Sequence, residues 1–134
     1  MRLLLVFASE VLLVLGLAGC GFVHDEKITG PYRLVAIDIS AQMSVCYTLE
    51  KSDCIGRIPE TVFSVGWNDR FIVAKQHPSN NRSVTNYFIL ELARDGKLAD
   101  PSASVTGPLS ATAFEGKVAS LGLPPFTKTI EALK

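Results

Sequence analysis

The fold of this chain is decided by residues 61–76, TVFSVGWNDRFIVAKQ, in which two runs of β-branched and aromatic residues flank a central Asn-Asp pair. Such runs are typical of β-strands. Asn and Asp adopt positive φ angles at low cost, so a two-residue connection of this kind predicts a tight hairpin. Side chains alternate between the two faces of a strand, which places Phe63, Val65 and Trp67 on one face of the hairpin.

Strands of the same composition are expected on both sides of this hairpin, at residues 32–39, 44–49 and 86–92. Each is bounded by polar or turn-forming residues, as antiparallel strands are when short loops connect them. Together with the two hairpin strands, these segments predict a single curved or barrel-like antiparallel sheet of about five or six strands.

One helix is predicted near the C-terminus, beginning after Ser110 and ending before Gly122. Ser110 is a suitable N-cap, and glycine often ends a helix in a left-handed conformation. Phe114, Val118 and Leu121 recur at helical spacing and form one apolar stripe. We expect this stripe to pack against the apolar face of the hairpin, so that helix and hairpin share one core. The predicted fold class is α+β with β dominant.

The N-terminal residues predict export. Arg2 precedes an apolar stretch, residues 3–17, that is long enough for a secretory signal but short for a membrane span. This stretch ends in Leu17-Ala18-Gly19-Cys20, which resembles the lipobox of bacterial lipoproteins. In that family the cysteine thiol is lipidated, the chain is cut before Cys20, and acyl chains such as palmitate hold the protein at a membrane.

The resemblance divides the chain into a lipoprotein signal peptide at residues 1–19, a lipidated tether at 20–30 and a single β-rich domain at 31–134. It also implies a place in the bacterial cell envelope, anchored through Cys20 and facing the periplasm or the exterior. In a host with two membranes the outer one is expected, because Gly21 is not the acidic residue that retains many lipoproteins in the inner membrane. A plain secretory signal with a chance cysteine is the alternative.

The charge balance excludes one class of partner. The chain has 13 Lys and Arg residues against 13 Asp and Glu residues, so its formal net charge is zero. Nucleic-acid binding requires a basic stripe, and no such run occurs in the sequence. We therefore expect no nucleic-acid partner.

Two cysteines remain beyond Cys20, namely Cys46 and Cys54. An even pair in an exported protein predicts a disulfide, which would contribute about 2.5 kcal/mol by constraining the unfolded chain. A redox or metal pair is the alternative. Redox motifs favour two intervening residues, however, and further ligands are missing from the neighbouring sequence.

The sequence offers no recognisable catalytic constellation. A nucleophile elbow of the form G-x-S-x-G does not occur, and a lone histidine does not make a zinc site. His77 precedes Pro78 at the exit from a predicted strand, so we expect it in a surface loop. No catalytic residue, metal ligand or cofactor is assigned from the sequence.

A candidate binding surface is suggested by Trp67, Arg70 and Lys75, which all lie in the hairpin segment. An exposed aromatic flanked by cations is a common recognition element. Aromatic residues at alternating strand positions nevertheless more often pack in the core, and Lys on an edge strand discourages pairing with other molecules.

Residues 58–62 and 65–76 also carry a resemblance to a family of small bacterial lipoproteins built on a domain of unknown function, and this resemblance extends over about residues 59–123. The shared core has the form W-[DN]-x-[RK]-[FY]-I-[IV]-A-K-Q. Members of that family continue with a strand like residues 86–91 and a segment like residues 107–110 that opens a helix. Cys46 and Cys54 lie outside this pattern. The resemblance supports the location and the order of strands without supplying an activity.

The expected function is therefore that of a membrane-anchored envelope lipoprotein whose small, non-catalytic domain binds another envelope protein. Two alternatives come from other classes. An inhibitor or immunity lipoprotein acting against an incoming hydrolase or phage would present a rigid exposed loop. An envelope enzyme would require a deep polar pocket, lined for example by His77 and a carboxylate.

Overall fold

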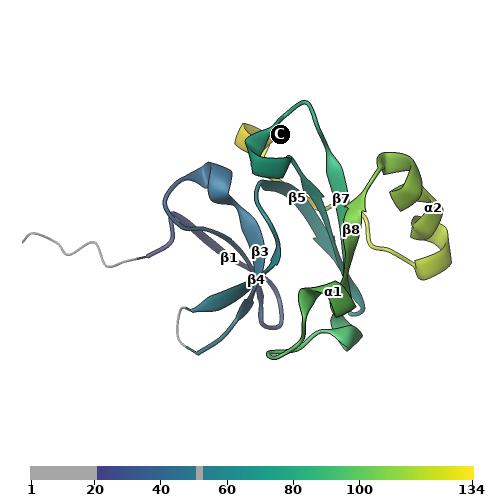
Figure 1. Ribbon diagram of the computed structural model, residues 1–134, viewed down its shortest axis with the longest axis horizontal. Coiled ribbons are helices and arrows are strands. Elements are labelled where there is room, and N and C mark those ends of the chain that lie inside the picture. The colour runs from purple at the N-terminus through teal and green to yellow at the C-terminus, as the bar shows by residue number, and fades with distance from the viewer. Residues whose placement is uncertain (1–20, 51–52) are drawn as a thin grey trace, which may run out of the picture.

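The computed structural model of the protein describes residues 21–50 and 53–134. The predicted signal peptide and the predicted lipidation site Cys20 lie outside the described residues. Within the described residues the chain forms nine strands in two antiparallel sheets (Figure 1).

The first sheet has four strands in chain order. They are β1 (His24–Thr29), β2 (Tyr32–Ala36), β3 (Ser44–Thr48) and β4 (Cys54–Ile58). The second sheet has five strands in the order β8-β7-β6-β5-β9. They are β5 (Val62–Trp67), β6 (Phe71–Gln76), β7 (Asn86–Glu91), β8 (Val105–Leu109) and β9 (Lys128–Thr129).

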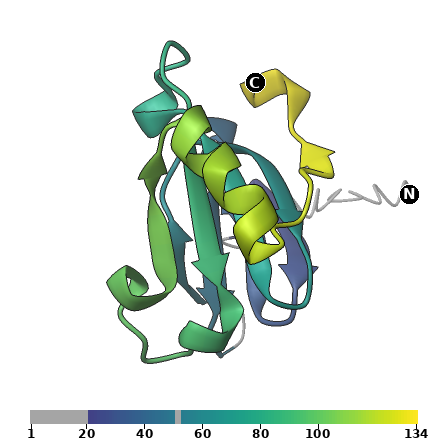
Figure 2. The ribbon, with the colours of Figure 1, turned by 90° about the vertical axis from the view of Figure 1, so that its right-hand side faces the viewer.

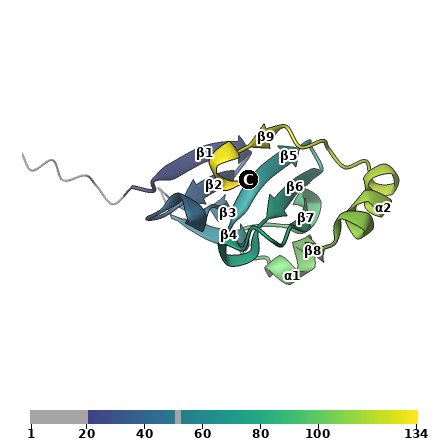
Figure 3. The ribbon, with the colours of Figure 1, turned by 90° about the horizontal axis from the view of Figure 1, so that it is seen from above.

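The β-dominant class is confirmed, but the prediction of one barrel-like sheet is wrong. The two sheets stack as layers and do not close into a barrel (Figure 3). The physical reason lies in the burial of β5, whose residues Val62 to Gly66 are all buried. A strand covered on both faces needs a layer on each side, and a single curved sheet supplies only one.

The core between the sheets is aliphatic. Leu34 and Val45 from the first sheet meet Val65, Ile72 and their neighbours from the second in one buried cluster. Val45 pairs with Leu34 on one side and with Ile58 on the other, so these three side chains share the inner face of the first sheet.

The predicted C-terminal helix is confirmed as α2 (Ala111–Leu121). The Ser110 hydroxyl accepts a hydrogen bond from the Ala113 amide at 3.1 Å, and Gly122 ends the helix with a φ of 68°. Short helical turns complete the secondary structure: α1 (Pro101–Ser104), η1 (Ser40–Gln42), η2 (Pro78–Asn80), η3 (Leu92–Arg94) and η4 (Glu131–Leu133).

Helix α2 lies across the outer face of the five-stranded sheet (Figure 2). Phe114 is buried there against Phe71, Val73 and Ile89. These residues alternate with the ones that face the first sheet, because neighbouring side chains on a strand point in opposite directions. The predicted single core of hairpin and helix is therefore wrong: Phe63 and Val65 belong to the core between the sheets.

A segment after α2 returns over the same outer face. It crosses β5 at Gly66, where a β-carbon would stand 1.9 Å from the Pro125 carbonyl oxygen. The chain then pairs with β5 as β9, through Val65 and Lys128. Gly66 thus permits the close approach of this segment, which covers the edge of the apolar cluster between α2 and the five-stranded sheet.

Residues 24–29, which lie in the segment expected to be a tether, form strand β1. This strand pairs with β2 from His24 to Thr29, and Ile28 is buried in the core between the sheets. The charged side chains of Asp25 and Lys27 face outward, which is why the segment reads as polar in the sequence. The ordered domain therefore begins before Pro31.

Candidate functional site

The three residues suggested as a binding surface do not form one patch. Trp67 lies at the end of β5, paired with Ile72, and is 37% exposed. Arg70 follows in the turn, where its guanidinium lies over the Phe71 ring. Lys75 lies on the outer face near the other end of β6, with its Nζ 4.7 Å from the centre of the Phe126 ring. Trp67 and Arg70 remain candidates for a shared surface, and Lys75 packs apart from them.

His77 is buried, which overturns its expected place in a surface loop. Its ring stacks on Phe63 at 4.1 Å, and its Nδ1 lies 2.8 Å from the Val84 carbonyl oxygen. Nε2 is buried without a hydrogen-bond partner among the described residues. His77 lines neither of the cavities described below. The segment that follows His77 thus folds back to the ring at Val84.

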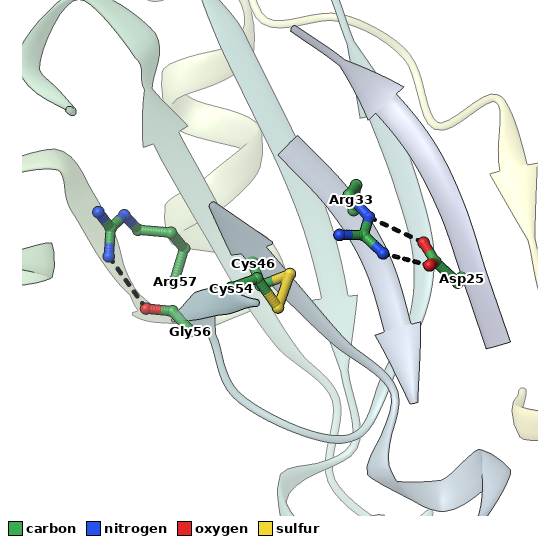
Figure 4. Close-up of a disulfide and its surroundings, with 6 residues drawn as sticks. All are labelled: Asp25, Arg33, Cys46, Cys54, Gly56 and Arg57. Carbon is green, nitrogen blue, oxygen red and sulfur yellow. Dashed lines mark hydrogen bonds and ion pairs between the residues drawn. A yellow bond between two sulfur atoms is a disulfide. The ribbon is translucent and has the colours of Figure 1, made fainter. Parts of the chain in front are cut away.

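The predicted disulfide is present between Cys46 in β3 and Cys54 in β4 (Figure 4). The two Cα atoms are 5.7 Å apart, on strands that pair directly. On the adjoining strands Arg33 donates to Asp25, with Nε 2.8 Å from Oδ1. The disulfide therefore links the neighbouring strands β3 and β4 covalently, and its role is structural.

A buried polar cluster lies where one end of the first sheet meets the second. Arg57 Nε donates to Asp95 Oδ2 at 2.8 Å, and neither side chain is exposed to solvent. Tyr32 donates its hydroxyl to the same oxygen at 2.8 Å, and Ser104 donates to Oδ1 at 2.9 Å. Arg57 also donates to the Gly96 carbonyl oxygen at 2.8 Å. Each member thus has a partner, as burial of charge requires.

Protonation in this cluster follows from its hydrogen bonds. Burial raises the pKa of Asp95, but hydrogen bonds from Arg57, Tyr32 and Ser104 lower it by more, so the pKa lies below its ordinary value. Burial, reinforced by the hydrogen bond to Asp95, raises the pKa of the Tyr32 hydroxyl well above its ordinary value. The carboxylate stays charged and the phenol stays neutral at physiological pH.

An aromatic-lined cavity of about 300 Å³ opens beside this cluster. The rings of Tyr32 and Tyr47 meet edge to face at 5.4 Å, and the Arg57 guanidinium lies 5.3 Å from the centre of the Tyr47 ring. The lining comes from the first sheet, from its β1–β2 turn and from the η3 turn that follows β7: Thr29, Gly30, Pro31, Tyr32, Tyr47, Leu92 and Asp95. A cavity of this kind accepts apolar groups.

The cavity lies at one end of the sandwich, which we call the hairpin end and define by residues 30–31, 68–70 and 92–100. The Leu92 amide donates to the Arg70 carbonyl oxygen at 3.0 Å, which joins the β5–β6 turn to the cavity wall. Leu98 projects from the same end and is 96% exposed. The hairpin end therefore combines a hollow, the exposed Trp67 ring and a protruding aliphatic side chain.

Little in the sequence points to the Arg57–Asp95 cluster. Arg57 directly follows Gly56 within β4, and an isolated cation in such a strand is typical of an exposed edge. Asp95 and Gly96 indicate a turn and nothing more. The sequence points to this region only when strand pairing is considered. Tyr32 and Tyr47 become cross-strand neighbours once β2 and β3 are placed side by side.

A second hollow has a volume of about 470 Å³. It runs between the turn η1 and strand β4, and its lining is Ile37, Gln42, Ser44, Gly56, Arg57, Ile58, Pro59 and Glu60.

Over residues 21–50 and 53–134, no helix is long and apolar enough to cross a bilayer. The same residues contain no group of three His, Cys, Asp or Glu side chains arranged to hold a metal ion.

Comparison with known proteins places the domain in a family. No curated protein and no solved structure matches the chain. Residues 29–130 match the family described as "Protein of unknown function (DUF3997)". This match runs from the last residue of β1 to just beyond β9, so it includes strands β2 to β9, α2 and every residue of the Arg57–Asp95 cluster. The chain belongs to the DUF3997 family.

Proposed function

We propose that the protein is a lipid-anchored protein of the bacterial cell envelope whose β-sandwich binds another envelope protein through the hairpin end. The observation that carries the binding part is the 300 Å³ cavity between Tyr32, Tyr47 and Leu92. The anchoring part rests on the lipobox-like residues 17–20.

The cavity wall favours binding over reaction. Both oxygens of Asp95 already accept hydrogen bonds from side chains of the protein. What remains toward the cavity is aromatic and aliphatic surface from Tyr32, Tyr47 and Leu92. Protein interfaces are centred on such pockets, into which one partner inserts an anchoring side chain.

The position of β1 supports the anchoring part. Four positions separate Cys20 from His24, the first residue of β1, and four extended residues span at most about 14 Å. A lipid on Cys20 would hold the start of β1 close to the membrane. Strand β1 has six residues and rises about 20 Å, so the hairpin end would face away from the membrane.

The anchor is tested by mass spectrometry of the membrane fraction from a bacterial host that produces the full chain. We expect an acylated peptide that begins at Cys20, and a Cys20→Ser variant that leaves the membrane fraction. An unmodified Cys20 peptide, with the variant still membrane-bound, would reject the anchor.

The binding surface is tested by capture from cross-linked envelopes with the anchored protein as bait. Leu98→Asp at the hairpin end is compared with Leu121→Asp, which changes a half-exposed leucine on α2. We expect one cross-linked partner band that Leu98→Asp removes and Leu121→Asp keeps. Retention of the band in both variants would place the binding surface elsewhere.

The geometry of the 95–100 loop favours an inhibitor as the second candidate. The base of this loop is fixed by the Arg57 hydrogen bonds to Asp95 and Gly96, while Leu98 projects into solvent. A rigid loop with an exposed apolar tip can enter the cleft of a hydrolase. If this candidate holds, cells that carry the protein resist an added muramidase, and Leu98→Asp abolishes the resistance.

A further inference from the structure

The end of the sandwich opposite the hairpin end carries an apolar patch of its own. It consists of Val23, Ile37 and Ile39, which are 57%, 56% and 60% exposed. The Val23 amide donates to the Ile37 carbonyl oxygen at 3.2 Å, so the first two lie side by side on neighbouring chain segments. We call these three residues the entry patch.

The entry patch is held in place by the surrounding structure. The Gln42 side-chain oxygen accepts hydrogen bonds from the Asp38 amide at 2.7 Å and the Ile39 amide at 3.3 Å. The Gln42 amide in turn donates to the Ile39 carbonyl oxygen at 3.0 Å. This closed turn keeps Ile37 and Ile39 exposed, although the hydrophobic effect favours their burial.

The position of the patch indicates what covers it. Val23 is three residues from Cys20, a span of at most about 11 Å. A lipid on Cys20 would bring the patch to the surface of the bilayer. Aliphatic side chains at that surface enter the boundary between headgroups and acyl chains, where burial of apolar area adds to the anchor.

We propose that the entry patch of Val23, Ile37 and Ile39 rests in the surface of the phospholipid bilayer and orients the anchored domain on the membrane. This inference rests on the proposed lipid anchor. A single flexible anchor leaves a domain free to tumble, whereas a second contact beside it fixes which end points outward. The hairpin end, at the far end of the same strands, is then presented to partners.

The charges around the patch are compatible with this placement. Asp25, on the same sheet, is paired with Arg33. Asp38, which lies between Ile37 and Ile39 in the sequence, is exposed and can reach the headgroup region or water. The contact is thus apolar in character, and we expect it on neutral phospholipid as well as on anionic phospholipid.

The test uses the full-length protein, purified in detergent and reconstituted into vesicles of phosphatidylcholine and phosphatidylethanolamine. A polarity-sensitive fluorophore is attached at Ile39→Cys, with Leu98→Cys at the hairpin end as the matched control. A lipidated Cys20 and the Cys46–Cys54 disulfide offer no free thiol to the dye. We expect a blue shift and a rise in emission at position 39 on reconstitution, quenched by spin-labelled lipid, and no change at position 98.

The outcomes separate this inference from the proposed anchor. Failure of the protein to enter the vesicles, or labelling of the unsubstituted protein at a free Cys20 thiol, would reject the anchor and the inference with it. Entry into the vesicles with an aqueous signal at position 39 would overturn the inference alone. A blue shift that increases with the amount of protein per vesicle, and that spin-labelled lipid does not quench, would show that a second protein molecule covers the patch. This result would also overturn the inference.

A variant with Val23→Ser, Ile37→Ser and Ile39→Ser provides a second test. It should stay anchored, but a dye at the neighbouring exposed position Ser40→Cys should no longer be quenched by spin-labelled lipid.

Discussion

Arg57 and Asp95 form an ion pair with Nε 2.8 Å from Oδ2, and solvent reaches neither side chain. Arg57 belongs to the four-stranded sheet, and Asp95 belongs to the loop that leaves the five-stranded sheet. The pair therefore joins the two layers at the hairpin end. It also fixes the wall of the cavity from which the proposed binding function is argued.

Substitution of either residue of this ion pair should lower the stability of the fold. Asp95→Asn leaves the Arg57 guanidinium buried without its counter-ion, so we expect the free energy of unfolding to fall by about 3–5 kcal/mol. The matched control is Asp25→Asn in the exposed pair with Arg33, for which the expected loss is about 1 kcal/mol or less. Chemical denaturation of both variants measures the difference. Equal losses in the two variants would show that the buried pair is not a principal link between the sheets.

The same pair makes stability depend on pH. The pKa of Asp95 is lower in the folded protein than its ordinary value of about 4. Its contribution is fully present above that ordinary value and is lost as the pH falls through the lower folded value. We expect the unfolding free energy of the wild-type protein to fall more steeply below about pH 4 than that of Asp95→Asn. Parallel curves for the two proteins over that range would contradict the assignment.

Gly66 lies under the chain segment that carries Pro125, so even a methyl group should be excluded there. We expect Gly66→Ala to cost about 1–3 kcal/mol, because the returning segment has to move away from β5. Gly56→Ala is the control, since a Cβ at Gly56 meets nothing within 4 Å. Thermal unfolding of the two variants should separate them by several degrees, and a neutral Gly66→Ala would refute the close approach.

Phe114 anchors α2 to the outer face of the second sheet. We expect Phe114→Ala to reduce stability by about 3–5 kcal/mol, the usual cost of removing a buried phenylalanine. Leu121→Ala, at the half-exposed end of the same helix, should cost less than about 1 kcal/mol. Denaturant unfolding followed by circular dichroism reports both values. A small effect at Phe114 would mean that the helix is only loosely attached.

The disulfide should add stability without deciding the fold. Thiol labelling of the unfolded, unreduced Cys20→Ser protein should find no free thiol. Reduction should then lower the free energy of unfolding by about 2–2.5 kcal/mol, as expected for a short closed loop. Two labelled thiols before reduction would show that the bond does not form in solution.

Local features of this fold could be predicted from the sequence. Ser110 and Gly122 mark the ends of α2 through capping chemistry that acts within a few residues. The hairpin of β5 and β6 is confirmed, but the predicted two-residue turn is wrong: residues 68–70 connect the strands, and neither Asn68 nor Asp69 has a positive φ. The Asn68 side chain closes the turn instead, by accepting hydrogen bonds from the Arg70 and Phe71 amides. These signals depend on neighbours along the chain, and the structure confirms both elements.

The partition into two sheets could not be predicted in the same way. The alternation of side chains along a strand shows which residues share a face, but it does not show which other strands pack against that face. These edge strands could not be predicted either: β8 contains Gly107-Pro108, and β1 carries Asp25, Glu26 and Lys27, so neither resembles a central strand. With β5 buried on both sides, Phe63 and Phe114 belong to different cores.

The candidate site was harder still to foresee. Arg57 and Asp95 are 38 positions apart, and nothing local distinguishes them from surface charges. Trp67 and Arg70 do lie near one turn, as the sequence indicates, whereas Lys75 lies on the other face of the sheet. Long-range contacts of this kind arise only when both sheets are assembled.

Our central claim is that the hairpin end of the sandwich is the surface that binds a protein partner. Site-specific photo-cross-linking in intact cells tests it most directly. A photoreactive amino acid is placed in the full chain at Asp69 or Leu98 on the hairpin end, and at Glu115 or Ala119 on the exposed side of α2. We predict one discrete protein adduct from the hairpin-end positions and none from α2. Adducts from α2 alone, or the same adducts from all four positions, would contradict the claim.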